Sequence, residues 1–136
     1  MQQDDFNEFL AKLLSARAAH PVREFKEILR LGEMLTEADI PHELRRHMMG
    51  GYQLTYYGHA GKPVAPAGHI YGAGMGAVCS AIETPMSYGN EKDLIEIQGL
   101  LTDKEYKETG RSVLGYLTAE DVFNRIKNHW ESKAGD

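Results

Sequence analysis

Hydrophobic residues recur at helical spacing within the first forty residues of the chain. The first stripe predicts a helix over about residues 5–18, with Asp4 or Asp5 as its cap, and consists of Phe6, Phe9, Leu10 and Leu13. After Pro21, a second stripe predicts a helix over residues 22–38 and consists of Phe25, Ile28, Leu29 and Leu35. Gly32 takes the remaining position of the second stripe, where a missing side chain would let another backbone approach closely.

The pattern changes to that of strands after Pro41. The segments HELRRHM and YQLTYYG, separated by the glycines of MGG, predict two strands joined by a turn. GAVCSAIET predicts a third strand because its residues are small or β-branched, and the alternation in DLIEIQGLL favours a fourth strand over a short helix. The loop from Gly58 to Gly74 is long for a compact domain, which is typical of functional or mobile segments.

Thr118 marks the start of a last helix. Together with Asp121 it resembles a capping box with Asp in place of the usual Glu, and the apolar stripe that follows consists of Val122, Phe123, Ile126 and Trp130. The order of elements predicts an α+β fold in a single domain over residues 1–136. We expect a small, mainly antiparallel sheet packed with two N-terminal helices and one C-terminal helix.

The net charge of -5 over 136 residues gives no general attraction to nucleic acid or anionic lipid, so we expect no DNA and no membrane partner. The charge is unevenly distributed. Between Pro41 and Ile82 the only acid is Glu43, against three basic residues, and four of the six histidines lie there. Two interpretations stay open: a sheet segment that is basic by chance between acidic helices, or a local anion site.

The start of the chain and its cysteine usage both indicate a cytoplasmic setting. The first residues, MQQDDFNEF, lack the basic segment and apolar stretch of a secretory signal, and Cys79 has no second cysteine to pair with. The uncharged stretch Pro63–Ile82 does not predict a membrane span, because proline and glycine replace the large apolar residues that insertion needs.

The glycine-rich stretch contains Gly72, Gly74 and Ala77 at the spacing of a dinucleotide fingerprint. Such a fingerprint must open a helix within a βαβ unit, whereas here it runs into AVCSAIETP, which has the pattern of a strand. We therefore do not predict a dinucleotide fold. A backbone nest for an anion stays open as an alternative to a flexible loop or a tight sheet contact, which we favour.

No catalytic, metal or cofactor site is predicted. Cys79 lies in an uncharged apolar segment that would raise the pKa of its thiol, so we interpret it as a core residue. The histidines show neither an H-E-x-x-H pattern nor a cysteine partner set for zinc. The expectation is a protein that binds rather than transforms its ligand.

The segment MSYGN suggests a ligand-binding turn. Tyr88, Gly89 and Asn90 would form a turn just before Asp93, and they combine an aromatic face, a permissive backbone and an amide suited to a nucleobase. An ordinary asparagine turn with a tyrosine packed on the core is the alternative. Arginines are the candidate phosphate ligands, and the remaining candidates of the set are Arg30, Arg111, Arg125 and Tyr71.

Two longer segments carry a resemblance to known proteins. SYGNEKDLIEIQGLL and SVLGYLTAEDVFNRIKNHWE resemble the C-terminal half of small accessory proteins from phages and prophages of gut Firmicutes, and the upstream order of a helix, ADIPHE and GGYQL is similar as well. The resemblance covers roughly residues 22–132. Within that set, the chain resembles the phage anti-Thoeris sponge family. Members of this family are homo-oligomers that sequester cyclic ADP-ribose signals from bacterial TIR proteins, and some also bind cyclic oligonucleotides.

This resemblance implies a phage immune-evasion protein that holds a cyclic nucleotide, without cleaving it, in the cytoplasm of the infected bacterium. It implies Tyr88 against adenine, arginines at the phosphates, and ribose or base-edge contacts from Asn90, Asp93 and Gln98. Two alternatives stay open. One is a phage protein–protein inhibitor or adaptor without a small-molecule ligand, using the N-terminal helices and exposed tyrosines, namely Tyr52, Tyr56 and Tyr57. The other is a small hydrolase of cyclic nucleotides.

Overall fold

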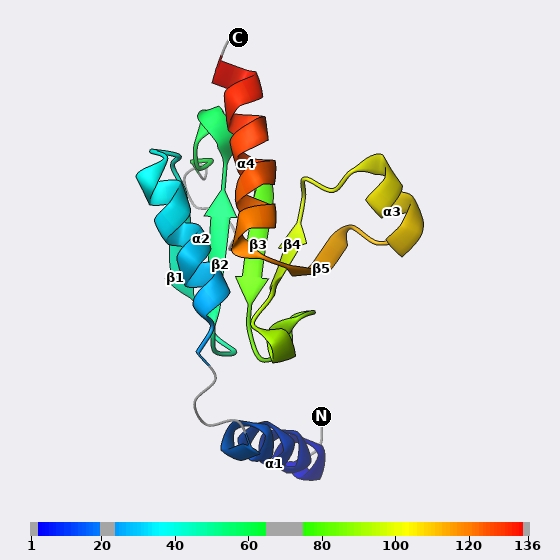
Figure 1. The fold of residues 1–136 in the computed structure, drawn as a ribbon. Helices are drawn as coiled ribbons and strands as arrows, with labels where there is room; N and C mark the ends of the chain where they lie inside the picture. The colour runs from blue at the N-terminus through cyan, green and yellow to red at the C-terminus, as the bar shows by residue number, and fades with distance from the viewer. Residues whose placement is uncertain (1–2, 20–23, 65–74, 135–136) are drawn as a thin grey trace.

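The fold is a five-stranded antiparallel meander covered on one face by two helices (Figure 1). A computed structural model describes residues 3–19, 24–64 and 75–134, and within the first helix the side chains of residues 4–12. The strands lie in chain order across the sheet: β1 (Glu43–Arg46), β2 (Tyr52–Tyr56), β3 (Cys79–Glu83), β4 (Ile95–Gln98) and β5 (Val113–Leu117). The helices are α1 (Gln3–Ala19), α2 (Lys26–Glu37), α3 (Asp103–Thr109) and α4 (Ala119–Ala134), with short 3-10 turns η1 (Gly58–Ala60) and η2 (Asn90–Lys92). The predicted α+β class is confirmed.

The glycine turn between β1 and β2 is confirmed, and the structure shows why glycine is needed there. Leu44 lies opposite Leu54 in the antiparallel register, and Arg46 lies opposite Tyr52. Gly51 has a φ of 75°, and a Cβ at this position would lie 2.0 Å from the carbonyl oxygen of Glu83 on the next strand. No side chain fits into this close approach of two backbones.

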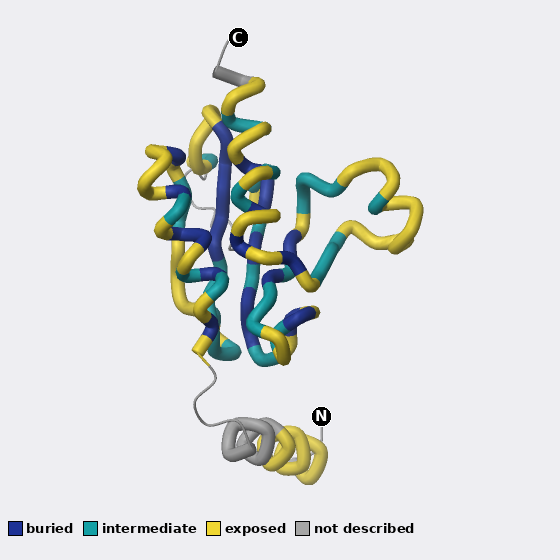
Figure 2. The backbone as a smooth tube through the Cα atoms, viewed as in Figure 1, coloured by how far each residue is buried: buried dark blue, intermediate teal, exposed yellow. Residues whose placement is uncertain are grey.

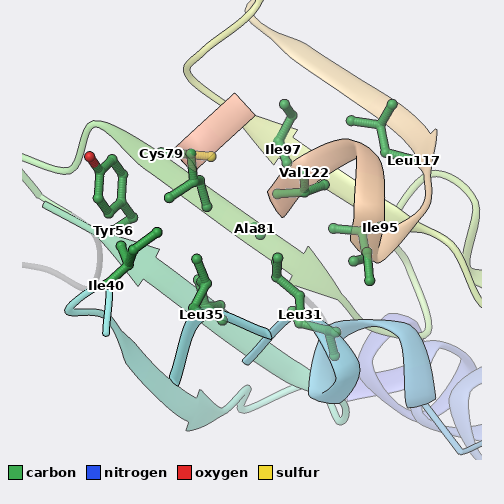
Figure 3. Packing of buried hydrophobic residues seen from close by; sticks show 14 of the residues in the cluster. Leu31, Leu35, Ile40, Tyr56, Cys79, Ala81, Ile95, Ile97, Leu117 and Val122 are labelled. Carbon is green, nitrogen blue, oxygen red and sulfur yellow. The ribbon is translucent and has the colours of Figure 1, made fainter. Parts of the chain in front are cut away.

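The core lies between the sheet and the helices α2 and α4 (Figure 3). Alternate strand residues point to the helical face, and they include Leu54, Tyr56, Cys79, Ala81, Ile95 and Ile97. The helices contribute Ile28, Leu31, Leu35, Val122 and Ile126, all fully buried. Cys79 is part of this cluster, and burial raises the pKa of its thiol to about 12, which confirms that it is a core residue.

The last helix begins as the sequence predicts. The Asp121 backbone N–H donates to Thr118 Oγ1 at 3.1 Å, and the Thr118 backbone N–H donates to Asp121 Oδ2 at 3.2 Å, so Asp does replace Glu in this capping box. The second helix begins at Lys26 rather than Val22, and residues 20–23 lie outside the described part of the chain. Gly32 faces the side chains of Leu44 and Leu54 rather than another backbone.

Two elements were not predicted. The helix α3 has a complete capping box, with Thr102 and Glu105 each bonded to the backbone N–H of the other. The strand β5 follows it and lacks a regular alternation, because Gly115 and Tyr116 occupy its centre, with Tyr116 at a φ of 61°. The SVLGYL segment therefore forms a strand whose register against β4 is irregular.

The helix α1 lies apart from the sheet and its covering helices (Figure 1), and its described side chains are exposed (Figure 2). The predicted helix is confirmed, but its apolar stripe is not buried: Phe6 and Phe9 are each 46% exposed and Leu10 is 39% exposed. Asp4 and Asp5 lie within the first turn rather than at the cap. Within the described residues, no helix is long and apolar enough to cross a membrane.

Candidate functional site

Two of the candidate ligand residues meet on the surface, although they lie 23 positions apart in the sequence. The Arg111 guanidinium donates from Nη1 to the Tyr88 hydroxyl at 2.7 Å, and its Cζ lies 5.8 Å from the centre of the Tyr88 ring. Tyr88 is 49% exposed. The chain therefore presents an aromatic face and a cation side by side to solvent, a pair that suits a base and a phosphate.

The backbone of Tyr88 is held by the two last strands. Its N–H donates to Glu96 Oε1 on β4 at 3.0 Å, and its carbonyl oxygen accepts from the Tyr116 N–H on β5 at 3.3 Å. Gly115 makes this packing possible, because a Cβ there would lie 2.3 Å from the Cβ of Tyr88. The tyrosine is thus fixed at its backbone while its ring stays at the surface.

Tyr116 is a site residue that the sequence analysis missed. It is 51% exposed, and its hydroxyl donates to Glu91 Oε1 at 2.6 Å. This hydrogen bond to a carboxylate raises the pKa of the Tyr116 hydroxyl, so the phenol stays protonated. A positive φ is unusual for tyrosine and is often found at functional positions. The break in alternation at Gly115 was the available sequence signal. We call Tyr88, Arg111, Tyr116 and Glu91 the tyrosine surface.

Asn90 lies in the same turn as Tyr88, as predicted, and its side chain stabilises that turn. Its side-chain Nδ2 donates to the carbonyl oxygen of Ser87. Gly89, between the two, has a φ of 99° and packs against the backbone of Tyr116. The predicted turn before Asp93 is confirmed, and the asparagine has the bonding of an ordinary asparagine turn.

Asp93 caps a helix from a distance. Its Oδ1 accepts from the backbone N–H groups of Lys26 at 2.9 Å and Glu27 at 3.2 Å, at the start of α2. Glu83 Oε1 accepts from the next N–H, that of Ile28, at 3.2 Å. The residue at the N-cap itself, Phe25, supplies no side-chain cap, so carboxylates from the β3 to β4 region complete the helix.

Further carboxyl groups lie close to this helix end. Glu83 is fully buried, and burial raises the pKa of its carboxyl group to about 9, with the neighbouring Asp93 carboxyl adding to the effect. Glu27 Oε2 accepts from the Ala119 N–H at 2.6 Å, at the start of α4. Arg30, another candidate, lies on α2 with its Nη1 3.6 Å from Glu27 Oε1. We call Glu27, Glu83 and Asp93 the capping carboxylates.

Arg125 holds α3 against α4. Its Nη1 and Nη2 donate to the two carboxylate oxygens of Glu105 at 2.7 and 2.6 Å, and Nη1 also donates to the carbonyl oxygen of Leu100 at 3.0 Å. The Arg125 guanidinium lowers the pKa of Glu105 to about 2. This candidate phosphate ligand already has a carboxylate partner of matching geometry.

The last candidates lie elsewhere. Gln98 is exposed at the end of β4, opposite Ser80 on β3 and Val113 on β5. Tyr71 lies outside the described residues, as do Gly72 and Gly74 of the glycine spacing. The segment after that spacing leads into β3 and not into a helix, which agrees with the rejection of a dinucleotide fingerprint.

The tyrosines expected to form an exposed protein-binding surface are not exposed, which corrects that expectation. Tyr56 is fully buried with its hydroxyl 2.7 Å from His129 Nδ1, and Tyr57 is also buried. Tyr52 is half-buried and packs against the core. Residues 52, 54 and 56 share the inner face of β2, so Tyr52 and Tyr56 follow Leu54 toward the helices.

A groove lies between α2 and the edge strand β1, away from the candidate ligand residues. Its volume is about 470 Å³, and its lining includes Leu29, Gly32 and Leu44 with Glu33 and Glu37. Within residues 3–19, 24–64 and 75–134, no three histidine, cysteine or acidic side chains are placed to hold a metal ion. Comparisons with protein-family models, with curated proteins and with solved structures find no match to the chain.

Proposed function

We propose that the protein binds a cyclic nucleotide of the cyclic ADP-ribose type at the tyrosine surface and sequesters it without cleaving it. The observation that supports this most directly is the pairing of the exposed Tyr88 ring with the Arg111 guanidinium. An adenine ring stacks on the open face of Tyr88, as bases do on aromatic side chains. A phosphate takes the Arg111 donors, which now bond the tyrosine hydroxyl.

The neighbouring groups suit the rest of such a ligand. Tyr116 offers a second half-exposed ring, and the Glu91 carboxylate that accepts from it can also accept from ribose hydroxyls. The resemblance to anti-Thoeris sponges supports the biological context, which is phage evasion of a nucleotide-based defence in the cytoplasm of the infected cell, by a homo-oligomer. Asp93 has no ligand role in this proposal, because its carboxylate caps α2.

A protein that sequesters its ligand must bind it tightly. Inhibition by a sponge is stoichiometric, and a nanomolar dissociation constant requires about 12 kcal/mol of binding free energy. The tyrosine surface is open, with both of its rings about half exposed, so a ligand there keeps one side in water within a single chain. The proposal therefore includes a second copy that covers the bound ligand.

The first test is retention. We mix the purified protein with the cyclic ADP-ribose product of an active bacterial TIR enzyme and remove free ligand by filtration. The protein is then denatured with heat, and the mass of the released ligand is measured by mass spectrometry. Intact ligand is the expected result. Recovery of a hydrolysed mass would support a hydrolase, and a folded protein that retains nothing would contradict the proposal.

The second test locates the site by calorimetry. Tyr88→Ala and Arg111→Gln are each expected to weaken binding at least tenfold, since a stacked base and a bidentate phosphate contact are each worth about 1–3 kcal/mol. Arg45→Gln is the matched control, because Arg45 is an exposed arginine on β1, four strands away. Equal affinity in all three variants would remove the ligand from the tyrosine surface.

A further inference from the structure

The two edges of the sheet differ in how well each could accept a further strand. The register of β5 against β4 shifts between Ile95 and Ile97, and Tyr116 near its centre has a positive φ. The other edge strand, β1, pairs with β2 at all four of its residues without a shift, and none of the four is a proline. Three of them are exposed (Figure 2). A regular, exposed edge of this kind is a template for pairing with another strand.

The turn after β1 determines which backbone groups of the strand face away from the sheet. The His47 N–H donates to the Gly51 carbonyl oxygen at 3.0 Å, so these two residues form a hydrogen-bonded pair of the hairpin. Hydrogen-bonded pairs alternate along an antiparallel ladder, so Arg45 and Glu43 also direct their backbone groups toward β2. Leu44, between them, directs its N–H and C=O to the open edge. A second strand can therefore bond to β1 at Leu44.

The side chains of β1 carry charges of both signs on one face of the sheet. Glu43 and Arg45 alternate with Leu44, which shares the helical face with Leu54, so both charged residues lie on the outer face. Arg45 has no ion-pair partner within the described residues. Glu43 Oε1 accepts from Lys62 Nζ at 3.1 Å, and a carboxylate can accept from a second cation at its other oxygen. The edge thus presents a carboxylate and a cation two positions apart.

One antiparallel register of β1 with a second β1 suits both the backbone and these charges. When Leu44 lies opposite Leu44 of the partner subunit, each can donate its N–H to the carbonyl oxygen of the other. In the same register, Glu43 lies opposite the partner's Arg45 on the outer face, and Arg45 lies opposite the partner's Glu43. The next registers on either side place Arg45 opposite the partner's Arg45, or Glu43 opposite the partner's Glu43. Like charges directly opposite each other are destabilising, so the strand is self-complementary with Leu44 at the two-fold axis.

We propose that two copies of the chain pair through β1 in this register, so that their sheets join into one. A two-fold pair uses each β1 edge once and closes the assembly, which protects the edge from further pairing. The tyrosine surface lies beside the other edge strand, β5, and this contact leaves it open. The dimer is therefore separate from the proposed function: a copy that covers the bound ligand would use a different contact.

Acidic side chains of the second copy also suit the other arginine of the strand. Arg46 is exposed and lies on the helical face, because it is two positions from Leu44. The register places it opposite His42 of the partner subunit, a position that lines the groove between α2 and β1 together with Glu33 and Glu37. Neither glutamate has an ion-pair partner within the residues that the structure describes. Both arginines of β1 are thus brought to acidic parts of the second copy.

Cross-linking tests the contact and its register. The full chain with Leu44→Cys is oxidised and run on a denaturing gel, and we expect a covalent dimer, because residues opposed at the axis lie within disulfide reach. Arg45→Cys should cross-link less, since its two copies lie diagonally, about 7–8 Å apart. Met48→Cys is the control for an exposed residue of the β1–β2 turn, and the native Cys79 is buried and does not compete. No cross-link in Leu44→Cys above the Met48→Cys control would overturn the proposal, and a stronger one in Arg45→Cys would overturn the register.

The dissociation constant of the dimer, measured by sedimentation, gives an independent test. Leu44→Pro removes the outward N–H and leaves the hairpin bonds in place, because an edge strand tolerates proline where its N–H faces solvent. We expect the dimer to weaken about a hundredfold, since both central hydrogen bonds are lost. Leu44→Ala is the matched control: it also loses the leucine side chain but keeps the N–H, and its dimer should be about tenfold tighter than that of the proline variant. A monomeric wild-type protein, or equal constants for the two variants, would contradict pairing through β1.

Charge reversal tests the register without changing the backbone. Glu43→Arg and Arg45→Glu each place like charges opposite each other in both halves of the two-fold pair, and each should weaken the dimer about tenfold. The double variant with both changes restores opposite charges across the axis and should recover the wild-type constant. An equal mixture of the two single variants should recover it as well, because each altered strand then meets its complement. Single variants without effect, or a double variant as weak as the single ones, would overturn the proposal.

Discussion

The segment between β3 and β4 serves two regions of opposite character. At its ends, the capping carboxylates Glu83 and Asp93 bond the backbone of α2 across more than fifty residues of sequence. In its middle, the backbone of Tyr88 bonds Glu96, while its ring lies half exposed and its hydroxyl accepts from Arg111. An acidic residue close to a candidate site can therefore be a structural cap rather than a ligand. The exposed Tyr88 ring and its arginine partner, by contrast, cap no helix and fill no part of the core.

The largest expected effect comes from the close contact between Gly115 on β5 and Tyr88. Gly115→Val adds a Cβ that would lie 2.3 Å from Tyr88 Cβ and 2.8 Å from its carbonyl oxygen, so the turn must move. We expect a loss of about 3 kcal/mol in the free energy of unfolding, as for other overpacked sites, together with loss of nucleotide binding. Urea unfolding measures the first. Gly110→Val is the control at a glycine with open space, where only its positive φ is strained.

The capping carboxylates predict a pH effect of the next size. The pKa of Glu83 is about 9 in the folded protein and about 4.5 in the unfolded chain, so the folded state holds the extra proton and the free energy of unfolding falls as pH rises between these values. Glu83→Gln keeps the acceptor for Ile28 N–H and removes this titration. We expect equal stability near pH 5 and a variant about 2 kcal/mol more stable at pH 6.5, since each pH unit between the two pKa values is worth about 1.4 kcal/mol. A difference that does not vary with pH would contradict a protonated Glu83.

Asp93→Ala tests the cap on the outside of the same helix. Two backbone N–H groups of α2 lose their acceptor, and we expect a loss of about 1–2 kcal/mol, in the range of helix caps. Asp93→Asn retains an acceptor oxygen and should recover most of it. Thermal unfolding measures both. If the alanine variant keeps full stability but loses nucleotide binding, Asp93 is a ligand residue and the division between the two regions is wrong.

The smallest effect on stability is expected at the tyrosine surface. Arg111→Gln and Tyr88→Phe each remove one exposed hydrogen bond, and both should change the free energy of unfolding by less than about 0.5 kcal/mol. Arg125→Gln is the contrasting arginine variant, since it breaks the bidentate pair with Glu105. A clear loss of stability in Arg111→Gln would give that residue a structural role like that of Arg125.

Periodicity was enough to predict most of the fold. The stripes of α2 and α4, the glycine turn of the first hairpin and the order of four strands follow from local pattern, and neighbouring strands in a meander need no long-range information. The strand β5 was missed because Gly115 and Tyr116 break its alternation. Tyr56 shows the opposite case: its spacing from Leu54 already indicated an inward side chain, but we expected it among the exposed tyrosines of a contact surface.

The candidate site was predictable in its chemistry but not in its partners. Tyr88 and Arg111 were selected one by one, and only the fold brings them within hydrogen-bond distance. Asp93 and Arg125 have equally suitable side chains, yet the fold uses them as a cap and an ion pair. These hydrogen bonds and ion pairs join residues twenty to seventy positions apart, and no local sequence pattern predicts them.

The distant capping of α2 sets an order of events as the chain leaves the ribosome. A twelve-residue helix without its own cap is marginal in water, and its acceptors, Glu83 and Asp93, are synthesised some sixty residues later. The β1–β2 hairpin can pair as soon as it emerges, since its contacts are local. We therefore expect α2 to become a stable helix only after the β3–β4 turn, with its two acceptors, has been synthesised.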